Sequence, residues 1–213
     1  MGGISYPNCA LCRFKFCASC FQGAQEAACP LTVFRDVIKD ALREYSSESV
    51  RAVHTAAAEV EKEGYCVWPR LREVAEFARR LGVRKLGVAF CEGLSREAEE
   101  VVKYFMSLGF EVYSVICKCG GIDKADAGLG EEVKLRPGSK EAMCNPIAQA
   151  MLLNEVGTEL NVIIGLCVGH DSLFIKYSKA LVTYLVAKDR VTGHNPAAAI
   201  YAKNYFSRRL GLT

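Results

Sequence analysis

Four short and strongly apolar runs, each followed by a helical pattern, constrain the fold of this chain more than any other feature. The runs are KLGVAFC (85–91), FEVYSVIC (110–117), NVIIGLCV (161–168) and LVTYLVAKD (181–189). The helical patterns that follow them span residues 95–109, 145–157, 171–179 and 195–206. Continuous apolar strands that alternate with helices are typical of parallel sheets covered on both faces.

We therefore predict an α/β fold with a three-layer, Rossmann-like architecture, in which helices cover both faces of a mostly parallel sheet. Apolar residues at helical spacing predict a helical lead-in over 31–82, and the strand–helix repeats occupy 83–213. Together they form one α/β domain, 31–213, preceded by a cysteine-rich metal-binding segment, 1–30. A chain of 213 residues is long enough for one domain with a small appendage.

Charge and hydropathy argue against two classes of partner. The net charge is only +3 and the basic residues are scattered along helical patterns, so we expect no nucleic-acid partner. The N-terminus has no apolar signal region, and the longest apolar run falls short of the ~20 residues of a membrane span. We expect a cytoplasmic protein, where the clustered cysteines among the eleven serve as metal ligands or redox groups rather than as structural disulfides.

Several cysteines fall where the predicted strands end. Cys91, Cys117 and Cys167 come at strand exits, and Cys144 directly precedes a helix that begins with Asn145 and Pro146. In parallel sheets, the carboxyl ends of the strands and the N-termini of the following helices share one edge, where ligands bind. We therefore predict that these four thiols converge and bind a cofactor.

An ordinary alternative exists for each of these cysteines, because a thiol buries as easily as a small apolar side chain. Cys66 and Cys119 lack the support of a strand exit and are interpreted as bystanders. His170 and His194 begin further helices at the predicted edge. Asp171 and Asp189 lie at strand exits, where an acid–base role competes with simple helix capping.

The N-terminal segment packs five cysteines into a stretch with few apolar residues. They are Cys9, Cys12, Cys17, Cys20 and Cys29, which is followed by proline. Because a segment with so few apolar residues cannot fold alone, we predict that a metal organises it. Paired Cys-x2-Cys knuckles suit zinc, whereas closely spaced thiols ending in Cys-Pro are typical of iron–sulfur loops. A redox dithiol set is the third possibility.

Longer motifs point to a known family. At MCNPIAQA, GLCVGHDSLFIKYSKA and VAKDRVTGHNPAAAIY the chain resembles the DUF1847 family of uncharacterised metal-binding proteins, found mostly in archaea and anaerobic bacteria. The segments CALC, GYCVWPR and VAFCEGLSREA extend the resemblance over nearly the whole chain. The family implies a metal bound through cysteines and no assigned reaction.

The resemblance also distinguishes among the cysteines. It matches four positions of the N-terminal segment, Cys9, Cys12, Cys17 and Cys29, and leaves Cys20 as an additional thiol. In the centre it matches Cys91, Cys117, Cys144 and Cys167, whereas Cys119 is peculiar to this sequence.

We expect an iron–sulfur protein of anaerobes with one or two [4Fe–4S] clusters. Cys91, Cys144 and Cys167 would hold the strand-end cluster, with Cys117 as the fourth ligand or as a thiol facing the substrate. An open iron would act as a Lewis acid for dehydration or sulfur abstraction on an unknown small molecule. The predicted catalytic residues are Cys117, His170 and Asp171.

Two other function classes fit the same residues. The first is a non-catalytic carrier of zinc or an iron–sulfur cluster, or an electron-transfer protein with a redox partner. The second is a metal-free thiol enzyme that transfers persulfide sulfur and requires a reactive thiol at Cys117 or Cys144. Zinc alone, above all at the N-terminal segment, remains open because it also accepts four thiolates.

Overall fold

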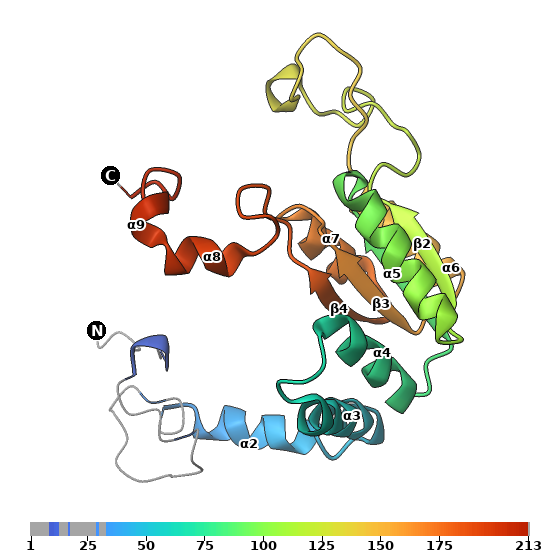
Figure 1. Cartoon of the computed structure of the whole chain (residues 1–213), viewed down its shortest axis with the longest axis vertical. Coiled ribbons are helices and arrows are strands. Elements are labelled where there is room, and N and C mark those ends of the chain that lie inside the picture. The colour runs from blue at the N-terminus through green and yellow to red at the C-terminus, as the bar shows by residue number, and fades with distance from the viewer. Residues whose placement is uncertain (1–8, 13–16, 18–28, 30–32, 213) are drawn as a thin grey trace. The chain divides into compact units, whose positions relative to one another are not determined.

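The structure, a computed structural model, describes residues 9–12, 17, 29 and 33–212 (Figure 1). The chain forms two compact units, Met1–Ala58 and Glu59–Thr213. The first unit contains the 3-10 helix η1 (Cys9–Leu11), α2 (Arg35–Glu44) and the start of α3 (Glu48–Gly64). The predicted domain boundary at residue 30 falls where the structure describes few residues, and it stays a prediction.

The second unit is the α/β domain. Its elements are α4 (Arg70–Arg80), β1 (Lys85–Phe90), η3 (Glu92–Leu94), α5 (Ser95–Ser107), β2 (Glu111–Ile116), η4 (Glu131–Val133), α6 (Pro146–Glu155), β3 (Leu160–Ile164), α7 (His170–Tyr177), β4 (Leu181–Val186), α8 (Pro196–Tyr201) and α9 (Lys203–Phe206). The strands form one parallel sheet in the order β2-β1-β3-β4 (Figure 1). This confirms the predicted α/β class.

The strand order contains a reversal that matters for the site. The chain passes from β1 outward to β2 and then returns past β1 to β3. Because parallel crossovers are right-handed, this reversal puts α5 on one face of the sheet and α6 with α7 on the other. The packing agrees, since α6 contacts α7 while α5 packs on β1 and β2. A topological switch point therefore lies between β1 and β3.

Apolar side chains from both faces form the core. All five residues of β3 are buried, as are Leu86, Val88 and Ala89 of β1. Phe105 of α5 and Phe174 of α7 close the core from the helical layers, and both are fully buried. The uninterrupted apolar runs of the sequence thus reflect burial of the central strands on both faces.

One polar group crosses this core. Asn161 of β3 is fully buried; it accepts a hydrogen bond from the Thr158 hydroxyl at 2.8 Å and donates one to Ser178 Oγ at 2.8 Å. Gly87 of β1 lies against it, and a Cβ at this position would stand 2.0 Å from Asn161 Oδ1. The central strand therefore needs glycine here to accommodate the buried amide.

Three local expectations differ from the structure. The strand predicted over 161–168 ends at Ile164, because Gly165 turns the chain with a φ of +63°. The helix predicted over 195–206 is interrupted at Ala202 and becomes α8 and α9. The helix predicted over 95–109 ends at Ser107, and the hydroxyl of its first residue, Ser95, donates to the Glu92 carbonyl at 2.6 Å. Among the described residues, no helix is both long enough and apolar enough to cross a membrane.

Candidate thiol site at the strand ends

Two of the predicted site cysteines are neighbours across the sheet. Cys91 follows β1 and Cys117 follows β2, and the register pairs Phe90 with Ile116 just before them. The ladder continues one step further, since the Cys117 amide donates to the Phe90 carbonyl at 2.8 Å. Both thiols are buried, with 7% and 3% of their surfaces exposed.

Cys167 belongs to the other strand at the switch point. It follows β3 by three residues, and the Cys91 amide donates to the Ile164 carbonyl at 3.1 Å, which joins the two strand exits. In open parallel sheets, ligands bind in the crevice at such a switch point. Cys91 and Cys167 therefore follow the two strands that flank it.

Cys144 reaches the site from a different direction, at the end of the long segment that leaves Cys117. The Asn145 amide donates to the Cys117 carbonyl at 2.8 Å, which ties the two segments together. Asn145 also caps α6, because its Oδ1 accepts from the Ala148 amide at 3.1 Å, and Pro146 takes the first helical position. The dipeptide Cys144-Asn145 thus both caps α6 and places a thiol beside Cys117.

The three thiols Cys91, Cys117 and Cys144 titrate as one set. Hydrogen bonding between Cys117 and each of the other two thiols is the largest cause of the pKa shift of all three. These hydrogen bonds, together with burial, raise the pKa of Cys117 well above that of an ordinary thiol. The same bonds lower the pKa of Cys91 and of Cys144. The arrangement therefore favours two thiolates that flank one protonated thiol.

Two cations from the exit of β4 complete the site. Lys188 Nζ lies 3.2 Å from Cys91 Sγ, and Arg190 Nη2 lies 3.2 Å from Cys167 Sγ. The bond to Cys167 raises the pKa of Arg190 and keeps it charged. The sequence analysis did not single out Lys188 or Arg190. Two basic residues on either side of Asp189, shortly after a strand, were nevertheless a usable signal.

Asp189 and His194 shape the turn that presents these cations. Asp189 Oδ1 accepts from the amides of Val191 and Thr192 at 2.8 and 3.1 Å. Its own amide donates to His194 Nδ1 at 3.1 Å, and His194 has a φ of +67°. In the structure both side chains are therefore engaged in the turn itself.

The two predicted acid–base residues differ in their surroundings. His170 begins α7, close enough to Cys144 to favour its thiolate. Asp171 accepts a hydrogen bond from the Tyr184 hydroxyl at 2.5 Å. Burial opposes ionisation of Asp171, but the hydrogen bonds from Tyr184 and Ser172 outweigh it and lower the pKa. Asp171 is thus held as a carboxylate that ties α7 to β4.

The two cysteines interpreted as bystanders lie in different places. Cys119 is half-buried beside the site, with its Sγ 3.7 Å from the Asn145 carbonyl, and burial raises its pKa. Cys66 is exposed after α3, at a φ of +57°.

The N-terminal cysteines are described only in part. Cys20 lies outside the described residues, Cys9 and Cys17 are exposed, and Cys12 and Cys29 are half-buried. In the part of the chain that the structure describes, no three His, Cys, Asp or Glu side chains are grouped as ligands of one metal ion. Metal binding at this segment and at the strand ends stays a prediction.

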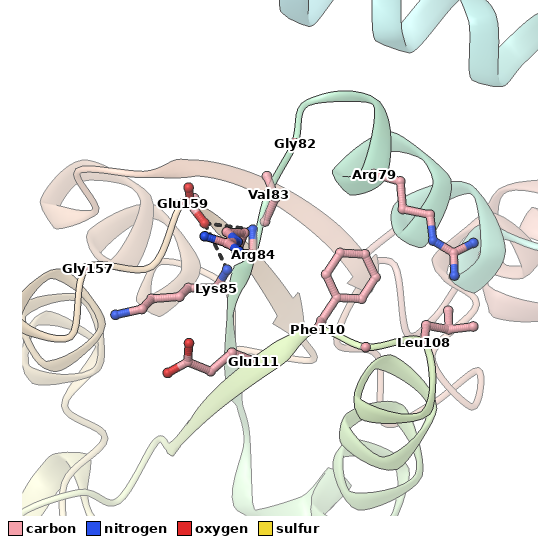
Figure 2. A pocket seen from close by; sticks show the side chains of 11 residues that line it. Arg79, Gly82, Val83, Arg84, Lys85, Leu108, Phe110, Glu111, Gly157 and Glu159 are labelled. Atoms are coloured by element: carbon pink, nitrogen blue, oxygen red, sulfur yellow. Dashed lines mark hydrogen bonds between the residues drawn. The ribbon is translucent and has the colours of Figure 1, made fainter.

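A hollow of about 700 Å³ opens at the opposite edge of the sheet, where the strands begin (Figure 2). Charged side chains line it, and two of them bind the ends of backbone elements. The Glu159 carboxylate accepts from the amides of Arg84 and Lys85 at 2.7 and 2.8 Å, and Lys85 Nζ donates to the Val156 carbonyl. These contacts stabilise a strand start and a helix end.

Comparison with known proteins matches the sequence of this chain to a family. The model of a family described as proteins of unknown function, DUF1847, matches residues 29–185, which include all four strand-end cysteines. An uncharacterised protein of Methanocaldococcus jannaschii is 47% identical over 176 residues, which cover 83% of this chain and 89% of that protein. The chain therefore belongs to the DUF1847 family.

Proposed function

We propose that the strand-end thiols bind a metal centre, with a [4Fe–4S] cluster as the first candidate and zinc as the alternative. The ligands are Cys91, Cys117, Cys144 and Cys167. One observation carries the proposal: cysteines that follow three strands and precede one helix lie at the same edge of the sheet, and Lys188 and Arg190 donate to the sulfurs of two of them. Both centres accept four thiolates.

The charges of the site support this assignment. Four thiolates carry four negative charges, and Lys188 and Arg190, which donate to two of the sulfurs, balance two of them. A dicationic centre, which Zn²⁺ is, would balance the remaining two. Without such a centre, burial and the neighbouring thiols raise the pKa of Cys117 and favour its protonated form.

Backbone donors add to the fit. The Glu92 amide donates to Cys117 Sγ at 3.3 Å, and the Gly93 amide donates to Cys91. Hydrogen bonds to cysteine sulfurs help set the reduction potential of an iron–sulfur centre. The chain therefore holds the sulfurs with fixed donors rather than leaving them to solvent.

The same residues have defined roles in a reaction. A cluster held by three thiolates supplies an open iron that acts as a Lewis acid. Cys117 would then remain as a thiol that faces a small-molecule substrate, and His170 would donate or accept a proton from its place beside Cys144. Asp171 would orient the start of α7 through Tyr184. If no substrate binds, the protein would instead carry the metal centre, or use it to transfer electrons to a redox partner.

We also propose a second metal, iron–sulfur or zinc, at the N-terminal segment. Its candidate ligands are Cys9, Cys12, Cys17, Cys20 and Cys29. Both proposed sites need reduced cysteines, and a reducing compartment keeps so many cysteines from forming disulfides. We therefore propose a cytoplasmic location.

Metal and acid-labile sulfide content of anaerobically purified protein tests the proposal. The wild type should contain iron and sulfide, and Cys91→Ser, Cys144→Ser and Cys167→Ser should each lose the strand-end share. Cys66→Ser serves as the matched control, since Cys66 is exposed and outside the site. Unchanged metal content in all three variants would disprove the proposal, whereas zinc without sulfide would select the alternative centre.

A second candidate is a metal-free sulfur-transfer enzyme, favoured by the pairing of thiolates with a protonated thiol. A thiolate at Cys144 or Cys91 would attack the outer sulfur of a persulfide donor. The new S–S bond forms as the donor's S–S bond breaks, and its electron pair leaves with the donor thiolate. Mass spectrometry of metal-free protein after exposure to a small-molecule persulfide should then show one added sulfur on Cys144 or Cys91. A purified protein that takes up no sulfur excludes this candidate.

A further inference from the structure

Residues 118–143 form an excursion whose two ends both lead to site thiols, Cys117 and Cys144. Residues 122–124 and 141–143 pair through backbone hydrogen bonds and form a stem. The Met143 amide donates to the Ile122 carbonyl at 2.8 Å, and the Lys124 amide donates to the Glu141 carbonyl at 3.0 Å. Asp123 pairs with Ala142 in an antiparallel bridge. The closed stem therefore acts together with the bond from the Asn145 amide to the Cys117 carbonyl in setting the distance between the two thiols.

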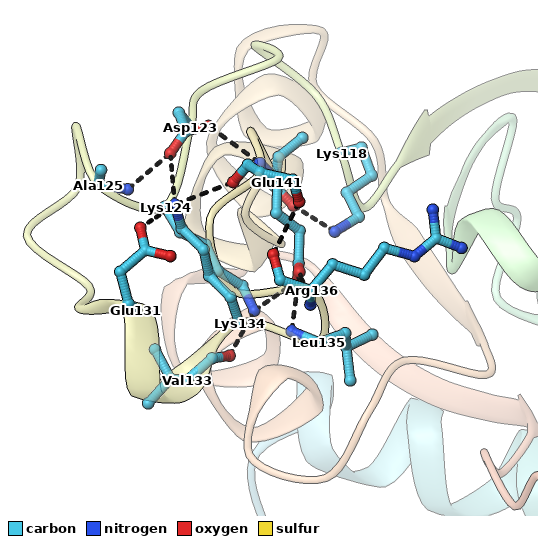
Figure 3. A network of polar contacts seen from close by, with 12 residues as sticks. Lys118, Asp123, Lys124, Ala125, Glu131, Val133, Lys134, Leu135, Arg136 and Glu141 are labelled. Carbon is cyan, nitrogen blue, oxygen red and sulfur yellow. Dashed lines mark hydrogen bonds and ion pairs between the residues drawn. The ribbon is translucent and has the colours of Figure 1, made fainter.

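A network of ion pairs closes the far end of the stem (Figure 3). The Lys134 side chain is only 5% exposed and lies between the carboxylates of Glu131 and Asp123. Lys124 Nζ lies 2.6 Å from Glu141 Oε1, with both side chains largely buried. These charges sit on residues that are distant along the excursion, so they fold it on itself.

Backbone amides bind the same carboxylates. Glu141 Oε2 accepts from the amides of Leu135 and Arg136 at 2.8 and 3.2 Å. Asp123 accepts from the amides of Ala125 and Glu141, both at 2.9 Å. Each carboxylate thus joins an ion pair to a turn of the backbone, and such networks lose more than a single bond when one member is removed.

Apolar packing does not replace this network. The larger apolar side chains of the excursion point to solvent: Leu135 is 89% exposed, Val133 50% and Leu129 42%. The ion pairs and their amide partners are therefore the core of the excursion.

We propose that Lys134 and Glu141 are positioning residues of the thiol site, which hold the stem closed and thereby fix Cys144 against Cys117. The consequence for metal affinity rests on the proposed function. The consequence for the thiol spacing does not, because the stem and its network are formed by residues of the chain alone.

Crosslinking of metal-free protein tests the spacing directly. A short bifunctional thiol reagent should join Cys117 to Cys144 and also Cys117 to Cys91, and peptide mass spectrometry separates the two products. Lys134→Met should lower the ratio of the Cys117–Cys144 product to the Cys91–Cys117 product roughly ten-fold. The substitution leaves the carboxylates of Asp123 and Glu131 without their cation, and their repulsion opens the stem. The Cys91–Cys117 product reports the register of the sheet and serves as an internal control.

Two further variants make the result decisive. Glu141→Gln keeps the shape and an oxygen acceptor but removes the charge opposite Lys124, and it should shift the ratio in the same direction if Lys134→Met fails to fold. Glu132→Gln is the matched control, because this exposed carboxylate of the same excursion forms no ion pair with any residue that the structure describes. An unchanged ratio in a folded Lys134→Met or Glu141→Gln protein overturns the inference.

Cobalt(II) binding, followed by its visible absorption, separates this inference from the proposed function. If wild-type protein binds cobalt, Lys134→Met and Glu141→Gln should weaken it while Glu132→Gln does not. A wild type that binds no metal, but whose crosslink ratio still falls in the variants, rejects the metal site and keeps the positioning role.

Discussion

The two edges of the sheet are both charged, but they use their charges in opposite ways. At the edge where the strands begin, carboxylates and cations satisfy backbone groups, as Glu159 does for Arg84 and Lys85. At the edge where the strands end, cations reach the thiols of other segments, as Lys188 does for Cys91. The first edge has the open hollow and the second has the reactive groups. The hollow and the strand-end thiols therefore lie at opposite edges of the sheet.

The difference follows from chain direction. Parallel strands start where helices finish, so backbone carbonyls accumulate at that edge and attract cations. The strands end where helices begin. At that edge, backbone amides such as those of Glu92 and Gly93 donate to the sulfurs and favour thiolates. The two edges should consequently respond to different mutations, one in stability and the other in ligand binding.

The largest expected effect lies between the edges, at Gly87. Gly87→Ala drives a methyl group into the buried Asn161 and breaks its polar contacts, so both edges should lose support. We expect a loss of about 3 kcal/mol in the free energy of unfolding, measured by urea denaturation. Ser114→Ala, at an exposed position of β2, is the control. A loss no larger than that of the control would show that Asn161 can move aside.

Lys188→Met tests the strand-end edge alone. The variant removes the donor to Cys91 Sγ but keeps most of the aliphatic packing, so stability should change by less than about 0.5 kcal/mol. Cobalt(II) affinity should fall about ten-fold, as is typical when a partner of a metal ligand is lost. Lys188→Arg should restore most of it. Equal affinity in Lys188→Met and the wild type would show that the cation is not needed.

Glu159→Gln tests the other edge and should have the smallest effect. The two amide bonds lower the pKa of Glu159, so its stabilising effect is complete above the ordinary carboxyl pKa and is lost as the pH falls through the lowered value. Because the side chain is exposed, we expect roughly 0.5–1 kcal/mol at pH 7 and a smaller difference at acid pH. Urea denaturation at both pH values measures this. Any change in cobalt(II) affinity would show that the edges are coupled.

Much of the fold was predictable because burial leaves a direct trace in the sequence. Central strands covered on both faces must be apolar throughout, and this gave the four parallel strands. The end of β3 was set too late because the apolar pattern continues through Leu166, which is buried in the turn after Gly165 rather than in the strand. Hydropathy reports burial, and a buried turn looks like a strand.

The site was less predictable. Strand-exit positions led to Cys91, Cys117, Cys144 and Cys167, and the structure brings the first three into hydrogen-bonding contact. Lys188 was missed because a lysine after a strand usually faces solvent. The polar core of the excursion had no sequence signal, since alternating charges do not show which lysine meets which carboxylate.

The placement of the four thiols has a kinetic consequence. Cys91 and Cys167 follow the central strands β1 and β3, whereas Cys117 follows the edge strand β2, and Cys144 is joined to it through the stem. Edge strands and their loops open locally far more often than the whole domain unfolds. One opening event would withdraw two thiols together and leave the other two in place. A bound centre would thus exchange at the rate at which the edge opens, so its lifetime need not follow the stability of the fold.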